Sequence, residues 1–217
     1  MRCPGKYYPE WRQARIHAIL DHYGEGFFRG KTLLEVGCGD GSIGNFFYYL
    51  GAIVTCSDAR QEFLDEIEHR NHQISVVQCD LDTHWPIPDD SDVVLHQGVL
   101  YHLGEPEASL RFACRRARNL ILDTEVSVGD TNDPTMIPER APDKEEREID
   151  DHCYGVMGCR PTVKFVEDIL EQEGMEFERV TGTKYDGHQW PPKLGWESEQ
   201  PGWVNGQRRM WFCKNNG

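Results

Sequence analysis

The sequence lacks any apolar stretch of about 18 residues, which is the length that a membrane-spanning helix requires. Its first residues also lack the apolar segment of a secretory signal peptide, so we expect a cytoplasmic protein. Basic residues are few, because 23 Lys and Arg stand against 37 Asp and Glu and give a formal net charge of −14. Such a surface repels phosphate backbones and disfavours nucleic-acid binding unless a local basic patch exists.

Cysteines are present, but they do not follow the pattern of a disulfide scaffold or of a zinc site. Eight cysteines are scattered through 217 residues. A chain of this length does not need disulfide bonds to fold, and this favours reduced thiols. Cys153 and Cys159, with His152 beside the first, come near metal-ligand spacing. No second close pair completes a set of four ligands, so we expect no metal.

Short apolar runs alternate with amphipathic stretches, which is the pattern of a parallel sheet covered by helices on both faces. The expected strands are 31–36, 52–57, 74–79, 92–96, 119–123, 175–180 and 208–214. The expected helices are 10–23, 45–50, 60–70, 109–118 and 162–173. We therefore predict a single α/β domain over residues 1–217.

Two long segments interrupt the alternation. Residues 126–160 contain prolines and an acidic run, and we expect them to form a cap or lid. Residues 182–206 are rich in Trp and Pro and are expected to leave the sheet as an excursion before the last strand. Tyr154 and Trp190 in these segments, together with Tyr8 near the N-terminus, are the predicted substrate contacts.

A glycine turn carries the clearest chemical signal. Glu35-Val-Gly-Cys-Gly-Asp-Gly41 follows the first expected strand directly and opens a helix. Glycines allow backbone torsions closed to other residues, and they let a ligand approach the main chain closely. Open α/β sheets bind nucleotides at this end of their strands, so the turn predicts a nucleotide-like ligand.

Two kinds of nucleotide fit the turn. Gly39, Gly41 and Gly44 satisfy the dinucleotide fingerprint, and Asp58 lies about 20 residues further on, so an NAD-dependent oxidoreductase is one alternative. Glu35, however, places a carboxylate under the turn, which disfavours a pyrophosphate. Asp80 adds an acid at the end of the third strand, where it could accept a hydrogen bond from an adenine amino group. These acids favour a cationic adenosyl sulfonium.

The chain resembles the class I S-adenosylmethionine-dependent methyltransferases. The resemblance rests on Leu34-Glu-Val-Gly-Cys-Gly-Asp-Gly41, Asp58, Cys79-Asp80 and His96-Gln-Gly-Val-Leu-Tyr-His102, which follow in the expected order. It implies a Rossmann-like, doubly wound sheet of seven strands, mostly parallel with an antiparallel last strand and with helices on both faces. It also implies S-adenosyl-L-methionine as cofactor and in-line methyl transfer, which we expect to reach a small-molecule or sugar-like acceptor.

Site residues follow from the same resemblance, position by position. Gly37, Gly39 and Gly41 would line the methionine moiety, Asp58 the ribose, Asp80 and Leu81 the adenine, and Gln97 the back of the sulfonium pocket. The full set of expected cofactor contacts is Glu35, Gly37, Cys38, Gly39, Gly41, Asp58, Ala59, Asp80, Leu81 and Gln97.

His102 and Tyr101, just past the fourth strand, are the predicted catalytic residues. A base is needed only if the acceptor starts protonated, and His is the usual proton acceptor near neutral pH. Tyr101 is expected to form a pocket wall, a role that needs no ionisation.

A narrower similarity leaves further alternatives open. Gly98-Val-Leu-Tyr-His102, Leu120-Ile-Leu-Asp-Thr-Glu125 and the segment from Arg160 to Leu170 are similar to the tRNA wobble-uridine carboxymethyltransferases. A tRNA-modifying enzyme and a carboxylated form of the cofactor therefore remain possible, although the net charge of −14 disfavours tRNA. A non-catalytic nucleotide-binding module is the remaining alternative.

Overall fold

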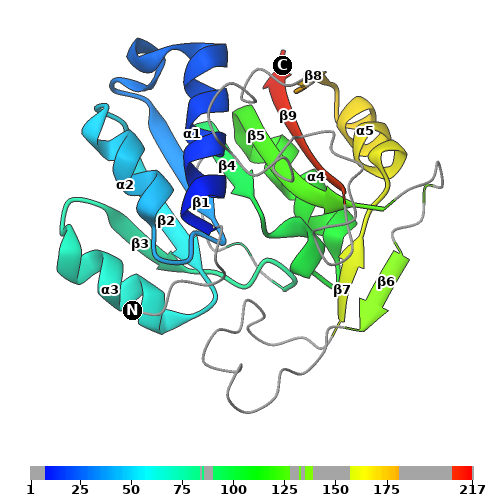
Figure 1. Ribbon diagram of the computed structural model, residues 1–217, viewed down its shortest axis with the longest axis horizontal. Helices are drawn as coiled ribbons and strands as arrows, with labels where there is room; N and C mark the ends of the chain where they lie inside the picture. Colours follow the sequence, from blue (N-terminus) through cyan, green and yellow to red (C-terminus); the bar gives the residue numbers. More distant parts are fainter. Residues whose placement is uncertain are drawn as a thin grey trace.

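The computed structural model describes residues 8–83, 85, 90–127, 132, 135–138, 157–180 and 207–216. Seven strands form one sheet in the order β3-β2-β1-β4-β5-β9-β8 (Figure 1). In that order they span Ser75–Gln78, Ile53–Asp58, Thr32–Val36, Ser91–Gln97, Ala117–Val126, Gln207–Asn215 and Met175–Arg179. Pairing is parallel from β3 to β5, and β9 runs antiparallel to both β5 and β8. The predicted fold class is confirmed.

Helices cover both faces of this sheet. Helices α1 (Tyr8–Tyr23), α2 (Ser42–Tyr49) and α3 (Gln61–Arg70) contribute buried side chains to the core on one face. Helices α4 (Pro106–Arg116) and α5 (Val163–Gln172) contribute to the core on the other face. Short 3₁₀ helices follow α1 (η1, Glu25–Phe28) and β4 (η2, Leu100–His102).

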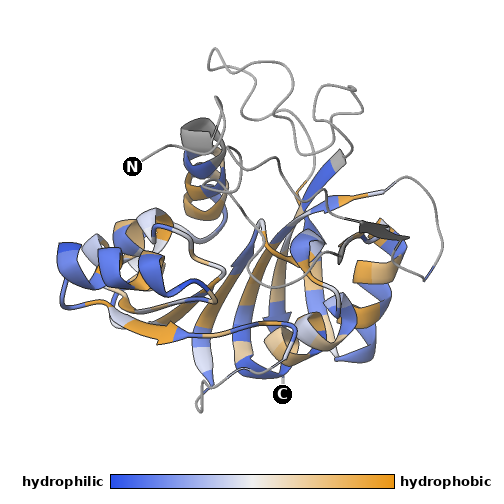
Figure 2. Cartoon of the chain, turned by 90° about the horizontal axis from the view of Figure 1, so that it is seen from below, coloured by the Kyte–Doolittle hydropathy of each residue, from blue (hydrophilic) through white to orange (hydrophobic). Residues whose placement is uncertain are grey.

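Strand β4 shows why an apolar run forms the middle of the sheet. Val93 and Leu95 lie in one core and Val94 lies in the other, so successive side chains are buried on opposite faces. A strand covered on both faces needs such a continuous apolar run. Hydrophobic colours run along the central strands in Figure 2.

Local signals set the ends of helix α5. The Thr162 hydroxyl accepts a hydrogen bond from Phe165 N at 3.0 Å and caps the helix start. Gly174 follows the helix with a φ of 73°, a left-handed conformation that favours glycine. Helix α5 (Val163–Gln172) corresponds to the helix predicted over residues 162–173.

The structure adds a hairpin that the sequence pattern did not indicate. Strand β6 (Thr135–Pro138) pairs antiparallel with β7 (Met157–Arg160) inside the segment 126–160. Helix α4 also ends two residues before the predicted end, because Ala117 already pairs with Ser91 of β4.

Some predictions fall outside the described residues. These are Tyr154, Trp190 and the excursion at 182–206, as well as the side chain of Tyr8 in the first turn of α1. The lid role of residues 126–160 stays a prediction. Among the helices that the structure describes, none is long and apolar enough to cross a membrane.

Candidate functional site

The predicted site residues gather where the carboxyl ends of the parallel strands meet. Val36 at the end of β1 pairs with Ser57 of β2, and Gln97 at the end of β4 pairs with Asp123 of β5. Strands β1 and β4 are themselves neighbours, so the four strand ends form one continuous edge. Groups that are far apart in the sequence are therefore brought together at this edge.

The glycine turn leaves β1 in a conformation that favours glycine. Gly37, Gly39 and Gly41 have φ angles of 60°, 52° and 65°, in the left-handed region that L side chains rarely adopt. A Cβ atom on Gly37 would also lie 2.7 Å from a methyl carbon of Val99. Cys38 lies buried between these glycines, and its amide donates to the carbonyl of Ser57. The turn is thus closely packed against β2 and the segment after β4.

Glu35 lies beneath the turn and holds the first turn of helix α2. Its Oε2 atom accepts a hydrogen bond from Gly44 N at 2.8 Å and lies 3.6 Å from the thiol of Cys56. Burial raises the pKa of Glu35 to about 7, although the Gly44 and Cys56 hydrogen bonds act in the opposite direction. The carboxyl group therefore holds a backbone amide at the start of α2.

The shifted pKa of Glu35 predicts a pH-dependent stability. A carboxyl whose pKa is raised from 4.5 to about 7 by folding stabilises the native state only while protonated, so stability falls as pH rises through this window. The unfolding free energy of the wild type should decrease by about 3 kcal/mol between pH 4.5 and 7.5, and the Glu35→Gln variant should not show this decrease. Urea unfolding of the wild type and the variant at several pH values measures this difference. The same pH dependence of unfolding free energy in both proteins would contradict the prediction.

Asp40 occupies the N-terminus of helix α2. Its Oδ1 accepts hydrogen bonds from Ser42 N at 3.0 Å and from Ser42 Oγ at 2.7 Å, and its Oδ2 pairs with Arg12 Nη1 at 2.8 Å. Burial alone would raise the pKa of Asp40, but Ser42 and Arg12 outweigh it and lower the pKa. Arg12 therefore fastens α1 to the glycine turn through an ionised carboxylate.

Asp58 ends β2 and holds the middle of the turn. It is only 3% exposed, and its Oδ2 accepts a hydrogen bond from Gly39 N at 2.9 Å. Its Oδ1 accepts from the backbone amide and the Nε of Arg60 at 3.1 and 2.9 Å. Ala59, between them, is buried, and its carbonyl accepts from the side chain of Gln78. The predicted ribose contact of Asp58 stays a prediction.

Asp80 and Leu81 follow β3 at the same edge of the sheet. Leu81 is buried in the core beside α4, and Asp80 Oδ1 accepts from Asp82 N at 3.1 Å. Asp82 in turn accepts hydrogen bonds from Gly104 N and Glu105 N, next to the start of α4. The adenine contacts expected of Asp80 and Leu81 stay predictions.

The last two residues of β4 face opposite sides of the sheet. His96 is fully buried and lies 3.3 Å from the Ser109 hydroxyl of α4, and burial lowers the pKa of His96 to about 4. Gln97 therefore points to the other face, which α1 covers. It is 7% exposed, and neither atom of its amide group has a hydrogen-bond partner among the described residues.

Tyr101 and His102 lie together on helix η2, just past the end of β4. Their ring centroids are 3.9 Å apart, and both side chains are partly buried. The Tyr101 hydroxyl accepts a hydrogen bond from Arg208 Nη2 at 3.2 Å. The two predicted catalytic residues thus contact each other and follow Val99, which packs against Gly37 of the turn, while their roles in catalysis stay predictions.

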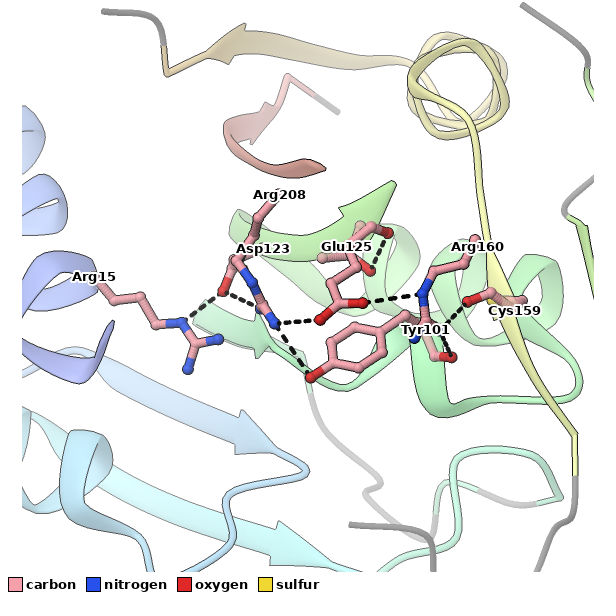
Figure 3. A network of polar contacts seen from close by, with 8 residues as sticks. Arg15, Tyr101, Asp123, Glu125, Cys159, Arg160 and Arg208 are labelled. Carbon is pink, nitrogen blue, oxygen red and sulfur yellow. Dashed lines mark hydrogen bonds and ion pairs between the residues drawn. The ribbon is translucent and has the colours of Figure 1, made fainter. Parts of the chain in front are cut away.

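Sequence reasoning missed a buried network of charges around Tyr101 (Figure 3). Asp123 pairs with Arg15 Nε at 2.5 Å and with Arg208 Nη1 at 3.2 Å. Glu125 pairs with Arg208 at 3.3 Å and with Arg160 Nε at 3.0 Å. The signal that could have found it is Asp123 itself, an acid that directly follows the apolar residues Leu120–Leu122 within β5.

The basic residues of α4 and of the start of β5 form ion pairs with acidic residues of the same chain. Arg111 and Arg115 both pair with Glu173, at 3.0 and 2.7 Å. Arg116 lies 3.7 Å from Asp90 and Arg118 lies 3.4 Å from Asp92. Within the described part of the chain, no group of three or more His, Cys, Asp or Glu residues is placed to hold a metal ion.

Comparison with known proteins agrees with this architecture. Residues 34–119 match the family model described as a methyltransferase domain. No curated protein matches the chain.

Several solved structures share the fold. The N-terminal domain of EvdMO1, crystallised in the presence of SAH and D-fucose, is 17% identical with a TM-score of 0.65. The alignment covers 97% of this chain and 84% of that one. An S-adenosylmethionine-dependent methyltransferase from Mesorhizobium loti is 16% identical with a TM-score of 0.65, covering 97% and 98% of the two chains.

A third structure is magnesium protoporphyrin IX methyltransferase from Synechocystis PCC 6803 with bound SAH. It is 16% identical with a TM-score of 0.63, and the alignment covers 99% of this chain and 90% of that one. At such identities the likeness shows the fold. Residues 34–119 of this chain thus match a methyltransferase domain, and the whole chain shares the fold of these solved structures.

Proposed function

We propose that this enzyme transfers the methyl group of S-adenosylmethionine to a small-molecule acceptor by in-line displacement. The observation that supports it is the pairing of Arg111, Arg115, Arg116 and Arg118 with acidic side chains of the same chain. Surface arginines that already pair with neighbouring carboxylates offer less positive charge to a phosphate backbone, and the net charge of −14 adds repulsion. The same observation disfavours the tRNA-modifying alternative.

Methyl transfer requires mainly that the acceptor is aligned with the methyl group and that water is excluded. When bound, S-adenosylmethionine supplies an activated methyl group, and the protein must hold the acceptor in line with it. We expect His102 on η2 to take a proton from a hydroxyl or ammonium acceptor, and Tyr101, whose ring contacts that of His102, to form a wall of the acceptor pocket.

The β6–β7 hairpin supports the proposed lid at residues 126–160. In β7, the Cys159 thiol donates to the carbonyl of Leu100 at 3.3 Å, and Arg160 Nη1 lies 3.4 Å from the carbonyl of Tyr101. The hairpin is thereby fastened to the helix that carries Tyr101 and His102, so that a lid continuing from it would cover the acceptor.

The NAD-dependent alternative is disfavoured by the N-terminus of α2. A dinucleotide places its pyrophosphate on the free amides of such a helix end. Here Asp40 accepts from Ser42 N and Glu35 accepts from Gly44 N, so two of these amides already have carboxylate partners. Isothermal titration should show binding of S-adenosylhomocysteine and none of NADH, and the reverse pattern would overturn the proposal.

Asp58 provides a direct test of the cofactor site. Replacing it with alanine should weaken S-adenosylhomocysteine binding by roughly 1–3 kcal/mol, because the Gly39 amide and the ribose hydroxyls lose their acceptor. Isothermal titration measures the effect. The matched control is Asp65→Ala on the exposed side of α3, where the carboxylate accepts from Gln61 in the preceding turn. Equal affinities for wild type and Asp58→Ala would contradict the assignment.

The acceptor class is tested by following labelled methyl groups. The enzyme is incubated with labelled S-adenosylmethionine and a panel of sugars, carboxylic acids, phenols and amines, with bulk tRNA in a parallel reaction. Label in a small molecule supports the proposal. Label in tRNA would overturn the small-molecule assignment, and cofactor binding without any product would favour the non-catalytic module.

A further inference from the structure

Helices cover only one face of the sheet at its β3 end. Helix α2 contacts β1 and β2, and α3 contacts β2 and β3, whereas α4 and α5 make their main strand contacts with β4, β5 and β8. The described residues that connect β3 to β4 form no helix. In Figure 2 the strands on the left have helices above them and, in the described part of the chain, none beneath. Parallel strands are normally covered on both faces, so one face remains here for a further covering element.

The alternation of side chains along the strands identifies the residues of this bare face. Val54 is buried in the core beneath α2 and α3, and Val76 packs against the same core. Their neighbours in β2 and β3 therefore project on the opposite face. Ile53 is 63% exposed and is one of two large hydrophobic side chains that are exposed in the described part of the chain. We define the β2–β3 patch as the exposed or half-buried residues Thr32, Ile53, Thr55, Ser75 and Val77.

The β2–β3 patch carries no ionisable side chain, although 28% of the residues of the chain are charged. The opposite edge of the sheet differs, because β8 exposes Glu176 and Glu178 to solvent. Charged side chains of this kind keep a sheet edge in water. Asp92 lies at the rim of the patch, where its Oδ2 accepts a hydrogen bond from Thr32 N at 3.0 Å. An uncharged centre with a polar rim is the composition of a protein interface.

We infer that the β2–β3 patch is the interface of a homodimer, in which the same patch of a second copy covers it. In a two-fold dimer a surface meets its own copy, so charges near the axis face identical charges. Most of the surface of a chain with a net charge of −14 would repel a second copy, and the uncharged patch would not. A basic partner would instead bind where exposed acids gather, as on α3 at Glu62, Asp65, Glu66 and Glu68.

Ile53 is the expected anchor of this interface. It is the largest apolar side chain of the patch, and the hydroxyl groups of threonine and serine surround it. Binding energy in interfaces is concentrated in such central side chains. Ile53 begins β2, whereas Asp58 at the other end of the strand holds the glycine turn. The dimer therefore leaves the glycine turn of each copy open, and the inference does not rest on the proposed function.

The experiment measures self-association of the full chain by sedimentation equilibrium from low to high micromolar concentration. Wild type should reach twice the monomer mass, and Ile53→Asp should raise the dimer dissociation constant by about 30-fold or more, because an anchor is lost and a charge is buried. The matched control is Tyr49→Asp, at the other exposed hydrophobic side chain, which is 76% exposed and lies on α2 at the covered face. This variant should dimerise like wild type. Circular dichroism of each variant checks that it is folded.

A photo-crosslinking residue at position 75 identifies what covers the patch. A covalent dimer whose cross-link maps to β2 or β3 of the second copy would support the inference. Wild type that stays monomeric at high micromolar concentration would overturn it, and so would Ile53→Asp that dimerises as tightly as wild type. Cross-links to a different protein of a cell lysate, with none to a second copy, would also show that the assignment to a homodimer is wrong.

Discussion

Replacing Asp123 with alanine is expected to lower the free energy of unfolding by about 3–5 kcal/mol. Asp123 is fully buried and is paired with Arg15 at 2.5 Å and with Arg208 at 3.2 Å. Removing the carboxylate leaves two guanidinium groups in a low-dielectric interior without their common counter-charge. Urea unfolding monitored by circular dichroism measures the loss.

A matched control for this variant is Asp168→Ala. Asp168 also forms an ion pair, with Lys164 at 2.7 Å, but this pair is exposed and spans one helical turn of α5. Its loss should cost about 0.3–0.5 kcal/mol, because solvent screens surface pairs. A destabilisation by Asp123→Ala as small as that of the control would mean that the buried pairs do not stabilise the fold.

Gly39→Val is expected to abolish binding of S-adenosylhomocysteine. Gly39 has a φ of 52°, which a β-branched side chain avoids, and its amide is held by Asp58 at 2.9 Å. Valine would force the turn out of this conformation and would place its side chain where the ligand approaches the backbone. Isothermal titration with purified variant measures the loss of binding.

The control for Gly39→Val has to carry the same backbone strain elsewhere. Gly30 has a φ of 73°, and a Cβ atom there would meet no other atom within 4 Å. Gly30→Val should therefore cost about 1–2 kcal/mol of stability and leave cofactor affinity unchanged. A Gly39→Val protein that still binds and turns over would show that the turn does not contact the cofactor.

Most of the sheet could be predicted from the sequence because its strands are buried on both faces. Such strands are continuous apolar runs, so the sequence pattern predicted β1, β2, β4 and β5. The glycine turn marked the end of β1. Strands β6 and β7 could not be predicted in the same way. Each has four residues, and β6 ends in Pro138, so neither gives a pattern that differs from a loop.

The site was predictable only where its residues follow one another along the chain. Gly37, Gly39 and Gly41 are adjacent in sequence, and the strand ends at Asp58 and Gln97 follow apolar runs. Arg15 and Arg208, the ion-pair partners of Asp123, are 108 and 85 residues away in the sequence. No local spacing pattern could therefore indicate them. Gln97 could be placed at the strand end, but its lack of partners is a property of the packed structure alone.

The position of β9 between β5 and β8 has a consequence for protein synthesis. While residues 207–215 are still inside the ribosome, β5 and β8 have no strand between them and Asp123 lacks Arg208. Pairings over such long sequence separations form late and slowly. A nascent chain therefore exposes two unpaired strand edges until this segment emerges, and it is at this stage that chaperones would be needed most.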